Sequence, residues 1–152
     1  MFENRVMPCL QLLDESLVKT VQFGKYSYIG DPLNTCRIFN ELEVDEMIIL
    51  GIRVTQNNER PDFSFLRKMS SECFMPLSYG GGIKTLRDAK EIFSSGFEKI
   101  VINSILFEDI GLIKQIVDIY GSQSVIASID IKKNIFGKYI IYSRSGMKKE
   151  SV

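Results

Sequence analysis

The chain has 152 residues, 45% of them hydrophobic and 25% charged, and its 19 basic and 19 acidic side chains give a formal net charge of zero. This composition predicts a single globular domain over residues 1–152, without the basic excess of proteins that bind nucleic acid or acidic membranes. No apolar run approaches the roughly 20 residues that span a bilayer, and the scattered cysteines fit a reducing cytoplasm rather than a disulfide or zinc framework. The chain has no histidine, so acid–base chemistry would use carboxylates, Lys, Tyr or Cys, and nothing in the sequence calls for a metal or an organic cofactor.

Short β-rich runs alternate along the chain with stretches of helical periodicity. Capping residues mark helix starts, as at Asp31 followed by Pro32, and at Thr85. In chain order, the predicted elements are a strand at 6–12, a loop to 30, a helix at 31–42, a strand at 47–50, a loop at 56–60, a helix at 63–73, a strand at 76–79, a helix at 85–93, a strand at 99–103, a helix at 106–120, a strand at 125–130 and a hairpin or sixth strand at 136–142. This order predicts an α/β fold with a parallel sheet and right-handed crossovers.

The alternation of side chains across each strand places charged residues together at the start of the sheet. If the polar faces point inward, Arg5, Glu46 and Lys99 form one layer with one carboxylate and two cations. Such a layer either forms buried ion pairs or caps the strand starts in water, and the pattern alone leaves both interpretations open. At the opposite end, the same faces carry Gln11, Asn103 and Asp130.

The ends of two predicted strands offer groups suited to an anion. Glycines 80–82 let backbone N–H groups approach an anion closely, and Asn103 and Ser104 close a second strand with hydrogen-bond donors. Because the carboxyl ends of parallel strands lie on one side of a sheet, these segments together predict a phosphate site. Asp130 follows an apolar strand and is either a catalytic carboxylate at that edge or a turn residue.

The residues resemble the N-terminal half of the cyclase subunit of imidazole glycerol phosphate synthase, a (βα)8 barrel of histidine biosynthesis. They look closest to the branch of homologues associated with amidino-sugar formation in surface polysaccharides. The matching segments run through nearly the whole chain, at 5–10, 18–19, 30–32, 44–46, 79–83, 99–104, 121–123 and 128–130. The resemblance implies a parallel (βα) half-barrel, the N-terminal half of a TIM barrel.

The family cyclase forms a heterodimer with a glutamine amidotransferase, whose ammonia passes through the barrel and closes an imidazole ring on a bis-phosphorylated ribulosyl substrate, releasing an aminoimidazole carboxamide ribotide. The resemblance implies that Asp130 is catalytic and that Lys19 lies on a loop that closes over the substrate. It further implies a phosphate grip of Gly82, Asn103 and Ser104, an ammonia gate of Arg5, Glu46 and Lys99, an ammonia path along Ser78, and docking of the amidotransferase at Glu98 and Gln123.

Departures from the family pattern qualify this assignment. The second catalytic carboxylate is replaced by Gln11, and because an amide does not exchange a proton near neutral pH, catalysis by two carboxylates should be impaired. Position 51, which is acidic in the cyclase, is Gly51. The second half of the barrel, with its phosphate site, is absent from the sequence.

The five predicted strands would leave two open sheet edges, which favour pairing. We therefore expect a second copy, a second half-barrel, or a truncated product. Three functions remain open at this point. They are an ammonia-using lyase, a non-catalytic ammonia conduit that docks a glutaminase for amidino-sugar synthesis, and an inert remnant.

Overall fold

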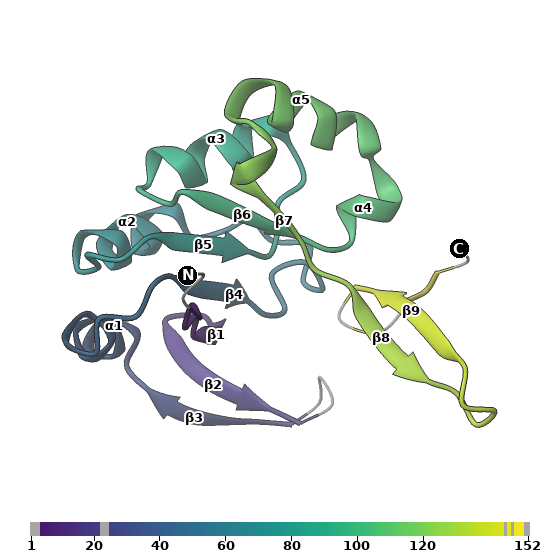
Figure 1. Ribbon diagram of the computed structural model, residues 1–152, viewed down its shortest axis with the longest axis horizontal. Helices are drawn as coiled ribbons and strands as arrows, with labels where there is room; N and C mark the ends of the chain where they lie inside the picture. Colours follow the sequence, from purple (N-terminus) through teal and green to yellow (C-terminus); the bar gives the residue numbers. More distant parts are fainter. Residues whose placement is uncertain (1–3, 22–24, 145, 147, 151–152) are drawn as a thin grey trace.

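The computed structural model describes residues 4–21, 25–144, 146 and 148–150 (Figure 1). Its elements are β1 (Cys9–Leu13), β2 (Ser16–Thr20), β3 (Tyr26–Gly30), α1 (Pro32–Glu41), β4 (Met47–Gly51), α2 (Phe63–Ser71), β5 (Leu77–Gly80), α3 (Leu86–Ser94), β6 (Lys99–Ile102), α4 (Ile105–Glu108), α5 (Ile110–Tyr120), the 3-10 helix η1 (Ser122–Ser124), β7 (Val125–Ala127), β8 (Asp130–Lys133), β9 (Tyr139–Ser143) and β10 (Lys148–Lys149). The main sheet has the strand order β3-β2-β1-β4-β5-β6-β7, and β8, β9 and β10 form a separate antiparallel sheet.

Strands β1, β4, β5, β6 and β7 pair in parallel, and helices α1, α2, α3 and α5 lie in the connections between them. This arrangement confirms the predicted parallel (βα) half-barrel. No helix among the described residues is both long enough and apolar enough to cross a membrane.

Local capping explains where the helices begin. The Asp31 carboxylate accepts a hydrogen bond from the backbone N–H of Asn34 at 2.8 Å, and Pro32 occupies the first turn of α1, where its missing N–H is not needed. Thr85 and Asp88 form a capping box at the start of α3. These helix starts depend on neighbouring residues, and the sequence predicted both of them.

The two faces of the parallel strands differ in packing. We call the face that carries Gln11, Leu50, Gly80 and Val101 the inner face, because these residues are aligned across β1, β4, β5 and β6. The opposite face packs against the helices through almost fully buried residues, which are Met47, Ile49, Leu77, Tyr79, Ile100 and Ile102. Burial of these apolar side chains is the main force that holds the helices onto the sheet.

The segment predicted as a loop up to residue 30 is instead two strands. After a tight turn at Asp14, whose φ is 52°, β2 pairs antiparallel with β1 and β3 with β2. The edge of β1 that was expected to be open is therefore covered, and the edge strands of the described main sheet are β3 and β7. The prediction was wrong because strand pairing across a turn depends on contacts that local composition does not reveal.

Two other boundaries also differ from the prediction. The helix expected at 106–120 is divided at Asp109, whose side chain accepts from the Leu112 N–H at 2.9 Å and so caps α5. The strand expected at 125–130 ends at Ala127, and Asp130 opens β8. The segment 136–142, expected as a hairpin or a sixth strand, supplies part of the turn and most of β9, and β9 pairs with β8 in a hairpin that extends away from the body of the molecule (Figure 1).

Candidate functional site

A cavity of about 370 Å³ opens at the C-terminal ends of the parallel strands. Residues predicted from separate parts of the sequence come together in its lining, which includes Gln11, Gly82, Asn103, Ser104 and Asp130. Lys19, predicted on a closing loop, lies within β2, is exposed, and is not among the described lining residues. Lys19 thus lies on a strand of the connection between β1 and α1, and its closure over a substrate stays a prediction.

The glycine turn after β5 lies tightly against the end of β4. Gly81 and Gly82 have φ angles of 120° and 69°, and a Cβ on Gly81 would collide with the Gly51 carbonyl. The Gly82 N–H donates a 3.0 Å hydrogen bond to the Thr55 hydroxyl. The N–H group predicted to hold an anion thus has a protein partner, which an anion would have to displace.

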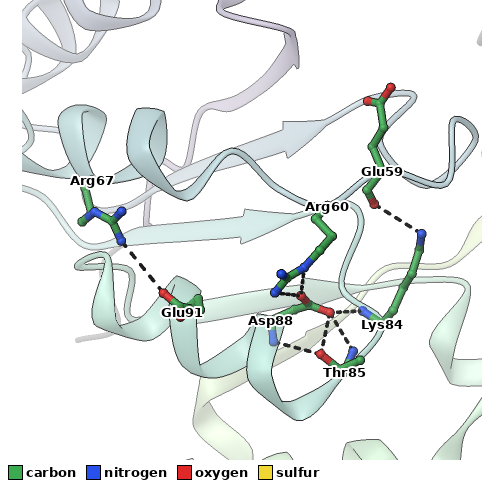
Figure 2. A network of polar contacts seen from close by, with 7 residues as sticks. All are labelled: Glu59, Arg60, Arg67, Lys84, Thr85, Asp88 and Glu91. Carbon is green, nitrogen blue, oxygen red and sulfur yellow. Dashed lines mark hydrogen bonds and ion pairs between the residues drawn. The ribbon is translucent and has the colours of Figure 1, made fainter.

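A polar network fixes the loop that carries Thr55 to the start of α3 (Figure 2). Arg60 contacts the Asp88 carboxylate through two nitrogens at 2.7 and 2.8 Å, and the backbone N–H groups of Lys84 and Thr85 donate to the other carboxylate oxygen at 3.1 and 2.9 Å. Burial by itself would raise the pKa of Asp88, but hydrogen bonds from Thr85, Arg60 and Lys84 outweigh it and hold that pKa below its usual value. Asp88 therefore stays ionised and holds the backbone of Lys84 and Thr85, which follow the glycine turn.

The lack of space next to Tyr79 explains why position 51 is a glycine. A Cβ at this position would collide with the hydroxyl of Tyr79, a residue that is buried on the helix-facing side of β5. The acidic residue that the cyclase pattern has at position 51 therefore does not fit next to Tyr79 in this arrangement.

Asp130 lies where the chain passes from β7 to β8. Burial raises the pKa of Asp130 above its usual value, and a hydrogen bond from the Asn103 side chain partly opposes that effect. The Asn103 Nδ2 also donates to the Ser128 carbonyl at 3.0 Å. A carboxyl group that lines a cavity can donate and accept a proton, and its burial favours the protonated form of Asp130 more than in an exposed aspartate.

Gln11 faces the same cavity, and its carbonyl oxygen accepts a hydrogen bond from the Thr20 hydroxyl at 2.8 Å. Its amide nitrogen is thereby left to serve as a hydrogen-bond donor. Position 11 can orient a ligand but cannot take a proton from it.

Ser104 links the cavity to the β8–β9 hairpin. Its hydroxyl oxygen accepts from the Arg144 backbone N–H at 3.2 Å, and the Arg144 side chain pairs with Glu108 at 2.8 Å. Because the Ser104 oxygen acts as the acceptor in this contact, its own O–H remains able to donate to an anion.

The N-terminal end of the inner face holds a layer of ion pairs around one buried carboxylate. Glu46, only 2% exposed, contacts Arg5 through one oxygen at 3.0 Å and Lys99 through the other at 2.5 Å. The sequence left open whether these side chains form ion pairs or cap the strand starts in water, and in the structure they form ion pairs. Ser78 is buried on β5 in register with Lys99, and Glu98 and Gln123 are exposed just before β6 and β7.

Comparison with known proteins identifies the family. A family model described as "Histidine biosynthesis protein" matches residues 5–152. The chain belongs to this family. Among the described residues of this family member, no group of three or more Cys, Asp or Glu side chains is arranged to hold a metal ion.

Three curated relatives share this similarity. The "Putative imidazole glycerol phosphate synthase subunit hisF2" of Pseudomonas aeruginosa is 49% identical over 146 residues, which cover 96% of this chain and 58% of that protein. The "Putative imidazole glycerol phosphate synthase subunit HisF" of Leptospira interrogans is 41% identical over 153 residues, covering 100% and 60%. The "Imidazole glycerol phosphate synthase subunit HisF" of Chlorobium luteolum is 36% identical over 146 residues, covering 96% and 58%. The chain spans about three-fifths of the length of these relatives.

Sequence reasoning missed several residues at the cavity of this histidine-biosynthesis family member. Thr20, Thr55 and Arg144 each make a hydrogen bond to a predicted site residue. The alternation of a strand at 16–20 could have indicated Thr20 if that segment had not been taken as a loop. Thr55 and Arg144 contact partners 27 and 40 residues away, and no local signal points to them.

Proposed function

We propose that the chain forms part of an ammonia-using cyclase site of the imidazole glycerol phosphate synthase type, acting on a phosphorylated ribulosyl substrate. The observation that carries the proposal is that the two ends of the inner face hold different groups. The buried Glu46 layer lies at its N-terminal end, and the cavity containing Asp130 lies at its C-terminal end. This arrangement suits a small molecule that enters at one end and reacts at the other.

The cavity residues support defined chemical roles. The Ser104 hydroxyl and the Gly82 N–H are donors suited to a phosphate, and Asp130 is the group that would exchange a proton with the substrate. Gln11 would donate a hydrogen bond where the family pattern has a second carboxylate. Lys19 would act only after β2 moves toward the cavity. One acid–base group in place of two predicts slow turnover.

The N-terminal end of the inner face is where we expect a partner protein to bind. In the proposed function, Arg5, Glu46 and Lys99 gate ammonia that passes Ser78, and a glutamine amidotransferase subunit docks on the exposed Glu98 and Gln123. Glu46 is the only one of the three gate residues that is almost fully buried. Movement of Lys99 or Arg5 would therefore leave one oxygen of a buried carboxylate unpaired, which favours a closed layer in the absence of the partner.

A specific observation favours a second candidate. Gln11 stands where the family pattern has a second carboxylate, and its side-chain oxygen accepts a 2.8 Å hydrogen bond from the Thr20 hydroxyl. A protein that keeps the ion-pair layer but lacks this carboxylate could dock a glutaminase and conduct ammonia to another enzyme, such as one that forms amidino sugars. In that case the cavity would bind no reacting substrate.

Exchange of Gln11 separates the two candidates. The wild type, Gln11→Asp and the matched control Gln56→Asp, which adds the same charge elsewhere in the cavity lining, are each combined with a glutamine amidotransferase of the synthase type. For a cyclase, Gln11→Asp should raise ring formation by at least about a hundredfold over the control. For a conduit, all three should stimulate glutaminase activity and none should form the ring. If no version stimulates the glutaminase or forms the ring, both candidates are contradicted.

A further inference from the structure

Arg53 stands out among the charged residues that line the cavity. It lies two residues after the end of β4, and its carbonyl oxygen accepts a 2.7 Å hydrogen bond from the Asn57 N–H. Its φ of 66° is in the left-handed region, which an arginine seldom adopts. Backbone of this kind persists only where the surrounding structure holds it, and it is common at ligand-binding sites. The loop therefore fixes the point from which the Arg53 side chain leaves the backbone.

The side chain of Arg53 contacts an aromatic ring. Its guanidinium carbon lies over the Tyr26 ring, 4.9 Å from the ring centre. Tyr26 opens β3, lines the same cavity, and is paired in register with Thr20. Within the part of the chain that the structure describes, the Arg53 guanidinium takes part in no hydrogen bond and no ion pair. Because a contact with the face of a ring needs none of the five N–H donors of an arginine, these donors can bind a ligand.

The charges of the cavity lining do not balance. The described lining has three acidic and three basic residues, which are Glu108, Asp109, Asp130, Arg53, Lys84 and Arg144. Glu108 and Arg144 neutralise each other in a 2.8 Å ion pair, and the Asp109 carboxylate accepts from the N-terminus of α5. The hydrogen bonds of the Lys84 ammonium go to uncharged oxygens. Two cations thus remain for a single carboxyl group, and the cavity favours an anionic ligand.

Arg53 belongs to the loop that contacts the glycine turn. The Thr55 hydroxyl accepts from the Gly82 N–H at 3.0 Å, and a Cβ on Gly82 would collide with the Val54 side chain. The side chain of Arg53 reaches the opposite way, to Tyr26 at the start of β3. The cavity therefore offers donors to an anion at two places, one at the glycine turn and one at Arg53.

We propose that Arg53 binds a second anionic group, a carboxylate or a phosphoryl group, of a ligand whose phosphate lies at the glycine turn. A guanidinium can bind either group through two parallel N–H donors, and such charge-assisted pairs are stronger than hydrogen bonds between neutral groups. The Tyr26 ring holds the guanidinium in the cavity while its donors bind the ligand. The proposal rests on the proposed function in placing a phosphate at the glycine turn, and it adds a residue that selects the ligand.

The test compares three open-chain six-carbon probes that differ at one end. Glucitol 6-phosphate has one anionic group, 6-phosphogluconate adds a carboxylate, and glucitol 1,6-bisphosphate adds a second phosphoryl group. Calorimetry measures their dissociation constants with the full chain. At least one of the two probes with a second anionic group should bind about tenfold more tightly than glucitol 6-phosphate, and the tighter of the two identifies the group that Arg53 receives. Arg53→Gln should abolish this gain and change the affinity for glucitol 6-phosphate by less than about twofold.

Control variants separate a specific contact from a general effect of charge. Arg87→Gln removes the same charge from an exposed position of α3 outside the described cavity lining, and should keep the gain. Tyr26→Leu should reduce the gain about threefold, whereas Tyr26→Phe, which keeps a ring under the guanidinium, should retain it. Circular dichroism checks that each variant folds. If Arg53→Gln does not fold, Arg53→Lys decides, because it keeps the charge without the paired donors and should lose most of the gain.

The proposal is overturned if no probe binds or if all three bind the wild type equally. It is also overturned by a gain that persists in Arg53→Gln, or by one that Arg87→Gln reduces to the same extent. A gain unaffected by Tyr26→Leu would contradict the role given to the ring. None of these measurements requires turnover, so failure of the cyclase proposal is seen separately, in the absence of ring formation by Gln11→Asp.

Discussion

The two ends of the inner face use polar residues in opposite ways. At the N-terminal end, Glu46 engages both carboxylate oxygens in ion pairs, and its side chain is almost fully buried. At the C-terminal end, Gln11, Ser104 and Asp130 surround an open cavity, and each retains hydrogen-bonding capacity. The same alternation of side chains along the strands produces both ends.

This difference indicates which end is suited to bind a ligand. A buried polar group that is fully paired contributes to the fold, and disturbing it is unfavourable. A group with free donors or acceptors beside a cavity can exchange them for contacts with a ligand. The N-terminal layer is therefore expected to respond to substitution mainly in stability and the C-terminal cavity mainly in binding.

The largest expected effect on stability is at Glu46. Glu46→Gln would leave Arg5 and Lys99 next to each other without a countercharge, and should lower the free energy of unfolding by about 3 kcal/mol, a value at the low end for broken buried pairs because Arg5 is largely exposed. The control Glu98→Gln, at an exposed position of the same end, should change it by less than about 0.5 kcal/mol. Urea unfolding measures both. Equal effects of the two substitutions would contradict a buried, paired layer.

The two ion pairs drawn in Figure 2 give a second, smaller contrast. Asp88→Asn removes the countercharge of Arg60 and should destabilise the fold by about 2 kcal/mol. Glu91→Gln disrupts the exposed 4.0 Å contact with Arg67 and should cost less than about 0.5 kcal/mol. Thermal and urea unfolding of both variants are the measurements, and a Glu91 effect as large as that of Asp88 would be the contrary result.

Asp88 should also make stability depend on pH. Its folded-state pKa is lowered, so its contribution is complete above the ordinary aspartate pKa of about 3.9 and is lost as the pH falls through the lowered value. The stability difference between the wild type and Asp88→Asn should therefore shrink on acidification below about pH 4. A difference that stays constant down to pH 2 would show that Asp88 does not act through its charge.

The smallest expected effect concerns the cavity. Thr55→Val removes the acceptor that occupies the Gly82 N–H, so that a phosphate no longer has to displace it. With a net hydrogen-bond contribution of about 1 kcal/mol, affinity for inorganic phosphate should rise about fivefold. Calorimetric titration measures this change. Weaker binding in Thr55→Val would instead indicate that the Thr55 hydroxyl helps to hold the anion.

Features encoded by neighbouring residues could be predicted from the sequence. The caps at Asp31 and Thr85 involve partners three residues away, and the strand alternation placed Glu46 and Lys99 in one layer. Features that depend on distant contacts could not be predicted in this way. The pairing of β2 with β1 and the Thr55–Gly82 hydrogen bond join segments that only the fold brings together.

The predicted location of Asp130 was correct in one respect and wrong in another. It lines the cavity with Gln11, as the alternation indicated, but it opens β8 instead of ending the preceding strand. The reason is that Ser128 is held by Ile102 and Asn103, and the chain then leaves the main sheet. A run of apolar residues does not reveal such a change of sheet.

The most direct test of the account is an amide NMR titration of the full chain with inorganic phosphate. The account predicts saturable shifts at the Gly82 and Ser104 amides, next to the cavity, with the signals of Glu46 and Lys99 unchanged. Shifts that are absent at Gly82 and Ser104, or that centre on the N-terminal end, would contradict a phosphate-holding cavity at the C-terminal end of the inner face.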